Sequence, residues 1–375
     1  MKLLVLHWGT RGAGPQIQEH IASALVANLA AEVSVSFDAS SESARRLGSL
    51  TVPKLVIGRA GSSSKWWLFK RLAAQPMSAW KLVRFCRVNS IDVVYEVMDH
   101  PFQLAPRIVA RLCGIRVLTS VHDAVRHPGE ESRLLDLIAQ VSLRASDGVM
   151  TYSAAVARKL RVVTAIGRVQ IFQTVIGAFG APQQRGGARS APNAPFTVGF
   201  FGRIEAYKGL ARLAGAIVEL RERGVDVRLS IHGRGQLSAS EQLLLEQADA
   251  KVNNSWVSDT EIQAVIESFD ILALPYDDAS QSGVIGYALS SGTPTVATPV
   301  EGLREQVSDS GGGILARGMT THDFAAALEE LIVDPKLYRT LSEHAVESAR
   351  STYSWDRVSA DILSAARLLA KAPKA

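Results

Sequence analysis

Two basic side chains follow an apolar segment in the second half of the chain. Residues 196–201 are apolar enough for a buried strand, and Arg203 and Lys208 come soon after it. Further along, the small residues of segment 280–283 lead into a helical pattern, whose first backbone amides have no acceptor within their own helix. Paired cations and such amides both bind phosphate oxygens. Together they predict a receptor for a diphosphate.

The amides assigned to the phosphates are those of Ser282, Gly283 and Val284, where small side chains let a nucleotide approach the backbone. Both halves of the pattern also have a simpler interpretation. Cations are common at the ends of surface strands, and a serine before a helix is an ordinary N-cap. The position of the cations, after an apolar strand and between Gly202 and Gly209, favours the diphosphate, because parallel sheets bind ligands at the carboxyl ends of their strands.

This arrangement resembles the C-terminal half of GT-B glycosyltransferases, specifically the large retaining family 4. In that family an arginine and a lysine neutralise the diphosphate of a nucleotide-sugar, and the resemblance implies this catalytic role for Arg203 and Lys208. It also implies that Gly233 and Gly235 lie near the nucleotide base and that Glu305 contacts the donor. A Gly-x-Gly segment suits an ordinary tight turn as well.

The chain departs from the commonest family pattern at its E-x7-E motif. When Gly292 is aligned with the closing glycine of the family, Ala279 and Tyr287 stand in place of the two glutamates. Asp277 and Asp278, just upstream, are candidates for a replacement carboxylate, although an Asp pair before a helix is also good capping chemistry. The departure leaves the donor and the stereochemical outcome open.

The first half of the chain has its own strand-end residues. Gly12 and Gly14 follow the first predicted strand, but their spacing is not that of a dinucleotide-binding loop, and the resemblance implies that they line the acceptor side. His122, at another strand end, resembles a family histidine near the donor sugar or the acceptor; a turn histidine bonded to Asp123 is the alternative. Retention, which the family implies, needs no protein nucleophile, whereas inversion would use one of these two side chains as the base.

Short β-branched runs alternate with longer amphipathic stretches, which is typical of parallel sheets with helical crossovers. The expected strands are residues 2–6, 33–37, 54–57, 92–95, 116–121, 148–151, 196–201, 227–232, 271–275 and 294–297. The prediction is an α/β protein of the GT-B type, with two Rossmann-like domains facing each other across a cleft. Its parts are an acceptor-binding domain (1–180), a linker rich in proline and glycine (181–195), a nucleotide-sugar-binding domain (196–352), and a C-terminal helix and tail (353–375) that crosses back to the first domain.

The net charge of +5 is unevenly distributed, since residues 1–190 contain 24 Lys+Arg and 12 Asp+Glu, against 17 and 24 in residues 191–375. Segment 62–85 mixes basic and aromatic side chains, as membrane surfaces require. The predicted membrane contacts are Lys65, Trp66, Trp67, Lys70, Arg71, Trp80 and Lys81. A core helix with snorkelling cations and a surface for single-stranded nucleic acid are the alternatives. We expect a membrane and no nucleic acid, because many GT-B enzymes act on lipid-linked acceptors.

Composition narrows the setting of the protein. Two cysteines suit a reducing compartment, and the first residues resemble a buried strand more than a secretory signal. We therefore expect a cytoplasmic protein, peripheral at the inner face of the membrane. No spacing of metal ligands is evident, which predicts metal independence and no cofactor apart from the nucleotide-diphosphate sugar as substrate.

The resemblance implies a glycosyltransferase that moves a hexose to a lipid-linked or polysaccharide acceptor, with retention and without a metal. Two alternatives remain. A non-catalytic scaffold that binds a nucleotide-sugar is compatible with the missing glutamates. A GT-B-like nucleotide-sugar epimerase would need more carboxylates and histidines than the sequence offers at the expected strand ends.

Overall fold

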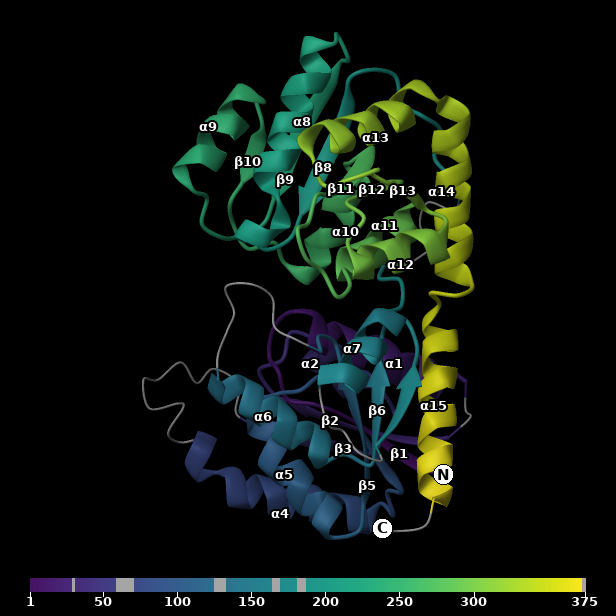
Figure 1. The fold of residues 1–375 in the computed structure, drawn as a ribbon. Coiled ribbons are helices and arrows are strands. Elements are labelled where there is room, and N and C mark those ends of the chain that lie inside the picture. The colour runs from purple at the N-terminus through teal and green to yellow at the C-terminus, as the bar shows by residue number, and fades with distance from the viewer. Residues whose placement is uncertain (29–30, 59–70, 125–132, 164–168, 181–186, 373–375) are drawn as a thin grey trace. The chain divides into compact units, whose positions relative to one another are not determined.

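The computed structural model describes residues 1–375 except 29–30, 59–70, 125–132, 164–168, 181–186 and 373–375. The described residues form two compact units (Figure 1). One unit contains those up to Val175 together with those from Trp355 on, and the other contains those from Ile176 to Ser354. Each unit is built on its own parallel sheet, so the predicted α/β class with two Rossmann-like domains is confirmed.

The first unit has a sheet of seven strands among its described residues, in the order β3-β2-β1-β4-β5-β6-β7, and all neighbours are parallel. The strands are β1 (Lys2–His7), β2 (Glu32–Asp38), β3 (Lys54–Ile57), β4 (Val93–Glu96), β5 (Arg116–Val121), β6 (Gly148–Thr151) and β7 (Gln170–Gln173). The helices are α1 (Ala13–Ala27), α2 (Ala44–Ser49), α4 (Gln75–Val88), α5 (Pro101–Leu112), α6 (Arg133–Arg144) and α7 (Ala154–Val163). The central strands are buried nearly throughout, which is why they appear in the sequence as apolar runs.

The last helix, α15 (Trp355–Lys371), packs on the first unit, where it contacts α1, β4 and β5. Trp355 at its start stacks on His20, with the ring centroids 4.9 Å apart. The hydroxyl of Thr174 donates a hydrogen bond to Asp361 over 3.0 Å. These contacts confirm that the terminal helix returns to the first domain.

The second unit has a sheet of six parallel strands among its described residues, in the order β10-β9-β8-β11-β12-β13. The strands are β8 (Phe196–Phe201), β9 (Val227–His232), β10 (Lys251–Asn253), β11 (Ile271–Leu274), β12 (Thr295–Ala297) and β13 (Gly313–Leu315). The helices are the 3-10 turn η1 (Ala206–Lys208), α8 (Leu210–Glu222), α9 (Ala239–Gln247), α10 (Asp259–Glu267), α11 (Gly283–Ser291), α12 (Glu301–Ser310), α13 (Thr321–Val333) and α14 (Pro335–Arg350). The two edge strands were not among those expected, because β10 is exposed and β13 is only half-buried, so neither appears as a buried apolar run.

Residues 187–195, the described part of the predicted linker, belong to the second unit. Arg189 fastens this segment. Its guanidinium donates to the carbonyls of Phe269 at 2.7 Å and Glu267 at 3.1 Å, and its backbone N–H donates to the Ser342 hydroxyl at 2.7 Å. Composition alone predicted a linker here because one anchoring arginine hardly changes the apolar content of the segment.

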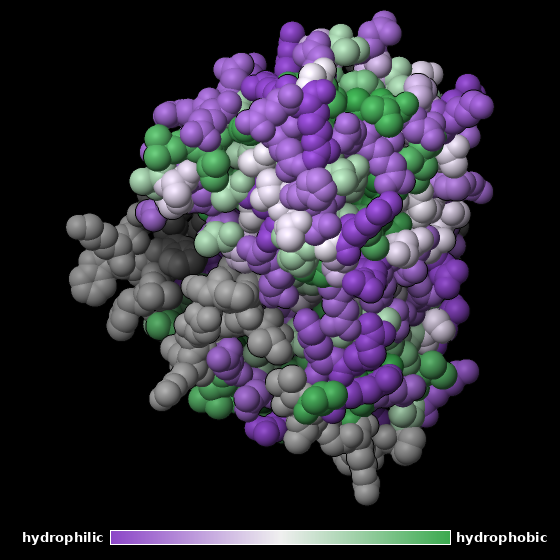
Figure 2. All heavy atoms as spheres, turned by 45° about the horizontal axis from the view of Figure 1, so that its top comes forward, coloured by the Kyte–Doolittle hydropathy of each residue, from purple (hydrophilic) through white to green (hydrophobic). Residues whose placement is uncertain are grey.

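The surface and the core differ as in other globular proteins. On the face shown in Figure 2, hydrophilic side chains predominate and apolar ones are scattered. The large fully buried side chains include Trp8 and Tyr95 in the first unit and Tyr276 and Tyr338 in the second. Within the described residues, no helix has the length and apolar content to cross a bilayer.

Candidate active site

The strand order of the second sheet determines where a ligand can bind. β8 lies between β9 and β11, so the chain builds one side of the sheet from β8 and then crosses to build the other. The loops after β8 and β11 therefore diverge at the carboxyl ends of neighbouring strands, where open parallel sheets bind ligands. Arg203 and Lys208 follow β8, and Ser282 follows β11. The topology thus brings the two predicted segments to one switch point.

Lys208 is held on the faces of two tyrosines. Its ammonium nitrogen lies 3.6 Å from the ring centroid of Tyr276 and 4.9 Å from that of Tyr207. Tyr276 is fully buried just after β11, and burial raises the pKa of its phenol to about 12, with a smaller opposing contribution from the Ser282 hydroxyl. Ring faces attract cations, so the two loops together orient the ammonium. The sequence analysis missed Tyr276, although an aromatic residue directly after an apolar strand was a visible signal.

Close backbone contacts join the loop after β8 to the loop after β11. Gly209 has a φ of 67°, and a Cβ there would lie 1.9 Å from the carbonyl oxygen of Pro275. The N–H of Asp277 donates to the carbonyl of Tyr207 at 2.7 Å. A side chain at position 209 would separate the loops, which explains the glycine directly after the lysine.

Arg203 lies at the surface of this loop. Its side chain is 58% exposed and forms an ion pair of 3.6 Å with Glu205, itself 44% exposed. Such an exposed pair contributes little stability, about 0–1 kcal/mol, so an incoming anion can compete for the guanidinium at small cost.

The start of α11 differs from the prediction in one of its amides. The N–H of Ser282 donates to the side-chain oxygen of Gln306 at 2.7 Å, and the Gln306 amide returns a bond of 3.3 Å to the Ser282 carbonyl. The Ser282 amide is therefore already used, which corrects its assignment as a phosphate donor. Gly283 and Val284 remain as first-turn amides without an acceptor in their own helix. Ser282 and Gln306 are far apart in the sequence, and no local sequence pattern indicates that they pair.

The two residues at the positions of the family glutamates are packed in the interior of the second unit. Ala279 is 3% exposed, and Tyr287 is stacked on Phe179 with the ring centroids 4.9 Å apart and the planes at 19°. A Cβ at Gly286, beside Tyr287, would lie 2.9 Å from the carbonyl of Gly177. The chain segment before residue 180 thus covers this part of α11, and Tyr287 belongs to that contact.

Asp277 already has a basic partner. Arg212 forms an ion pair of 2.6 Å with its carboxylate and also donates to the carbonyls of Pro275 at 2.5 Å and Met319 at 2.6 Å. Because this arginine fixes the carboxylate, Asp277 would have to leave an ion pair in order to replace a glutamate. Asp278 lies next to it and is half-buried.

The glycines of the Gly-x-Gly segment allow the backbones of two loops to lie in close contact. A Cβ at Gly233 would lie 1.7 Å from the carbonyl oxygen of Gly202, and one at Gly235 would lie 2.0 Å from that of Ile204. The Asn254 side chain exchanges two bonds of 3.1 Å with the backbone of Gly235. These glycines are thus required by packing at the ends of β8 and β9, whether or not a base binds beside them.

Glu305 lies in the second turn of α12, half-buried. Gly302 before it lets the helix approach the loop after β11, since a Cβ there would lie 2.2 Å from the Ser280 carbonyl oxygen. Burial, followed by the charge of Glu305, raises the pKa of Asp309.

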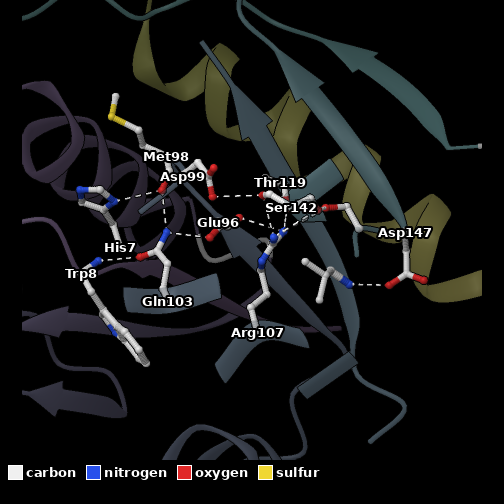
Figure 3. Close-up of polar contacts among 12 residues, drawn as sticks. His7, Trp8, Glu96, Met98, Asp99, Gln103, Arg107, Thr119, Ser142 and Asp147 are labelled. Carbon is white, nitrogen blue, oxygen red and sulfur yellow. Dashed lines mark hydrogen bonds and ion pairs between the residues drawn. The ribbon is translucent and has the colours of Figure 1, made fainter. Parts of the chain in front are cut away.

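In the first unit, the predicted acceptor-side loop surrounds His7. A Cβ at Gly14 would lie 2.2 Å from Nε2 of His7, so this glycine makes room for the ring, whereas Gly12 has a φ of 84° and open space around it. The Nδ1 of His7 lies 3.3 Å from the Met98 carbonyl (Figure 3). Burial lowers the pKa of His7 to about 3, so the ring is neutral. His122 lies with its ring centroid 4.6 Å from that of Tyr152, and burial also lowers its pKa against the charge of Asp123.

A buried polar network lies behind this loop, and the sequence analysis missed it. Glu96 and Arg107 form an ion pair of 3.0 Å with both side chains fully buried, and the Gln103 amide donates to Glu96 at 2.7 Å (Figure 3). Arg107 also donates to the hydroxyls of Thr119, Ser142 and Ser146. The Ser142 hydroxyl donates in turn to Asp99 over 3.1 Å. The partners come from β4, β5, α5 and α6, which no local pattern connects.

The predicted membrane residues divide into three groups. Lys65, Trp66, Trp67 and Lys70 lie outside the described residues. Arg71 is not available as predicted, because its guanidinium forms an ion pair of 2.5 Å with the fully buried Asp38 and is itself only 13% exposed. Trp80 and Lys81 are exposed on α4.

As for metals, no group of three His, Cys, Asp or Glu side chains in the described ranges is placed to hold an ion.

Known proteins resemble the chain in both sequence and fold. Residues 195–334 match the model of the family "Glycosyl transferases group 1". A D-inositol 3-phosphate glycosyltransferase of Actinosynnema mirum is 30% identical over 257 residues, which cover 63% of this chain and 59% of that protein. The chain thus spans about three fifths of the length of that curated relative.

Solved structures match nearly the whole chain. Sucrose-phosphate synthase from Thermosynechococcus elongatus has a TM-score of 0.69 at 16% identity and is covered over 98% of both chains. HepE of Anabaena, solved in complex with UDP-glucose, has a TM-score of 0.67 at 17% identity, covering 97% of this chain and 100% of its own. The second unit therefore resembles the glycosyl transferases group 1 family over residues 195–334, and the two parallel-sheet units have the GT-B fold of these solved structures.

Proposed function

We propose that the chain is a glycosyltransferase that moves a hexose from a nucleotide-diphosphate sugar to a lipid-linked or polysaccharide acceptor, with retention and without a metal. The observation that carries this proposal is the ammonium of Lys208 on the ring of Tyr276, at the switch point where α11 begins. This site lies within the residues that match the family. The UDP-glucose bound by the HepE relative supports a sugar diphosphate as the donor.

The proposed chemistry follows from the charges at this switch point. Breaking the glycosidic bond of the donor leaves negative charge on the departing diphosphate. Lys208 and Arg203 stabilise that charge, and the amides of Gly283 and Val284 bind the phosphate oxygens. With retention, the donor phosphate itself takes the proton of the acceptor hydroxyl on the same face of the sugar. No protein nucleophile is then required.

We assign the acceptor to the first unit. Its switch point lies between β1 and β4, where His7 and the glycine loop are found, and His122 follows the neighbouring β5. Burial lowers the pKa of both histidines, so both rings are neutral. The Nδ1 of His7 donates to the Met98 carbonyl, which leaves its Nε2 as a hydrogen-bond acceptor. Such groups suit the hydroxyls of a sugar or polyol. The name of the Actinosynnema relative makes inositol 3-phosphate the first acceptor to assay.

Nucleotide diphosphates test the donor site directly. We expect one of UDP, GDP, ADP, CDP and dTDP to raise the melting temperature, because a ligand at about a hundred times its dissociation constant stabilises a protein by about 2.7 kcal/mol. Thermal unfolding with each nucleotide is the measurement, and the matching nucleoside is the control for the diphosphate. Equal shifts by nucleoside and diphosphate would contradict a site built for two phosphates.

The membrane proposal now depends on α4. Its sequence contains Lys81, Arg84 and Arg87 and no acidic residue, and Trp80 is 54% exposed with the Arg84 guanidinium 5.2 Å from its ring centroid. Exposed basic and aromatic side chains on one helix suit the headgroup region of an anionic membrane. We propose that α4 contacts the inner face of the cytoplasmic membrane and that the protein is otherwise cytoplasmic.

Vesicle binding tests this assignment. The double variant K81A/R84A should bind phosphatidylglycerol vesicles more weakly by about twenty- to thirtyfold, since each basic residue near an anionic surface contributes about 1 kcal/mol. Co-sedimentation with vesicles is the measurement, and K336A, an exposed lysine of α14, is the matched control. Unchanged binding of the double variant would remove α4 from the proposal.

A scaffold that binds a nucleotide-sugar without turnover remains the second candidate. The packing of Ala279 and Tyr287 where the family has glutamates favours it. Donor binding without transfer, whatever acceptor is offered, is the result that would select it.

A further inference from the structure

Gln103 joins the two loops that flank the switch point of the first sheet. It lies in the first turn of α5 and is fully buried. Its side-chain oxygen accepts the backbone N–H of Trp8 at 2.9 Å, in the loop after β1. Its amide nitrogen donates to the carbonyl of Met98 at 2.6 Å, in the loop after β4, and to Glu96 at 2.7 Å (Figure 3). One side chain therefore sets the distance between these loops.

The orientation of the Gln103 amide is fixed from behind. Glu96 at the end of β4 accepts from the amide nitrogen, so the amide oxygen must face the loop after β1. Glu96 is itself held by Arg107, which is bound to hydroxyls of β5 and α6. The chain of contacts thus runs from the rigid core of the unit to its two ligand-facing loops.

The loop after β1 is shaped around the same point. His7 contacts the Met98 carbonyl, to which Gln103 also donates, and the His7 ring occupies the space that a Cβ of Gly9 or Gly14 would need. A shift of the Met98 carbonyl therefore moves His7, and His7 in turn moves the glycine loop.

We infer that Gln103 is a positioning residue for the acceptor, which it serves by fixing the loops 8–12 and 97–100 against each other. This inference rests on the proposed function, in which the first unit takes the acceptor. Only an amide satisfies all three neighbours, because it presents an acceptor to Trp8 and donors to Met98 and Glu96. A buried polar network costs desolvation free energy that an apolar core does not. A requirement for one fixed loop geometry explains why such a network is present here.

Two variants test the inference. Gln103→Leu removes all three bonds, and Gln103→Glu keeps the shape but replaces both donors by oxygen. Because a displacement of about 1 Å at a reacting group can cost about a hundredfold in rate, we expect kcat/KM for the acceptor to fall by about ten- to a hundredfold in each. The KM for the donor and the melting shift induced by the nucleotide diphosphate that binds, which report on the second unit, should stay as in the wild type.

The glutamate variant adds a signature in pH. At pH 8 it places a second carboxylate beside Glu96, whereas at pH 6 a shared proton restores one donor between them. The ratio of variant to wild-type kcat/KM should therefore rise as the pH falls, and that of Gln103→Leu should not. Other ionisable or charged groups lie around position 103 and also influence the pH dependence of this ratio. They are Glu96, Asp99, Arg107, His7, His100 and His122.

Gln18 supplies the matched control. It is also a fully buried glutamine of the first unit, but its amide donates to the strand carbonyls of Val5 and Ser36 at 3.1 and 2.8 Å and not to the loops. Gln18→Leu should lower the melting temperature and leave both KM values unchanged. Wild-type acceptor kinetics in both Gln103 variants, or an equal loss for donor and acceptor, would overturn the inference. Absence of transfer by the wild type itself would instead overturn the proposed function, and the inference with it.

Discussion

Replacement of Lys208 by alanine is expected to lower kcat by about a hundred- to a thousandfold, the usual effect of removing one group that stabilises transition-state charge. The ammonium lies on the ring of a fully buried tyrosine, so it is oriented before the donor binds and needs little reorganisation when charge develops. Initial rates of transfer from the donor selected by the melting shifts measure the effect.

The controls for Lys208 separate charge from packing. Lys336→Ala removes an exposed lysine of α14 and should leave the rate unchanged. Tyr276→Phe keeps the ring beneath the ammonium and should retain most of the activity, because attraction of a cation to a ring face does not need the phenol oxygen. A wild-type rate in Lys208→Ala would refute the assignment of this switch point to catalysis. The hypothesis of a scaffold that binds a nucleotide-sugar would then be favoured.

The parts of this site that sequence could predict are those that depend on strand order. An apolar strand followed by cations, and a small-residue loop before a helix, are local patterns, and the rule for parallel sheets brings their ends together. Arg203, Lys208 and the start of α11 were found in this way. The two parallel sheets followed from the alternation of strands and helices, because strands buried on both faces appear as apolar runs. The GT-B fold was implied by the resemblance of the motifs to that family.

The missed contacts pair side chains from distant segments. Gln306 takes the amide of Ser282, and Asp38 takes the guanidinium of Arg71; in both cases the partner is a polar residue in an otherwise unremarkable stretch. The packing role of the glycines was missed for a related reason. Gly233 and Gly14 are explained by a backbone carbonyl and a histidine ring that approach them in the fold, and a single sequence does not contain those distances.

Loss of the buried cation Arg107 should have the largest effect on stability. Removing one partner of a buried ion pair typically costs about 3–5 kcal/mol, because the other charge is left without compensation. Arg107→Met should reduce the free energy of unfolding by about that amount at pH 8, as measured by urea denaturation. Arg111→Ala is the matched control on the same helix. Its ion pair with Asp147 spans 3.3 Å and is 35% exposed at the arginine, so the expected loss is about 1 kcal/mol or less.

The pH dependence identifies Glu96 as the charge that is left behind. Burial raises the pKa of Glu96 to about 7 in the folded protein, against an ordinary value of 4.5, although Arg107 lowers it. The folded state therefore binds more protons than the unfolded one between these values, so this group makes the wild type less stable as the pH rises from about 4.5 to about 7. Without Arg107 the pKa rises further, and a neutral Glu96 no longer needs a cation.

The cost of Arg107→Met should accordingly be smaller at pH 5.5 than at pH 8. The double variant Glu96→Leu with Arg107→Met should recover most of the lost stability at pH 8, because it removes the uncompensated carboxylate as well as its partner. An equal loss at both pH values would show that the lost hydrogen bonds to Thr119, Ser142 and Ser146 dominate instead. The network would then act through its hydroxyls, and the charge of Glu96 would matter only as the acceptor that orients Gln103.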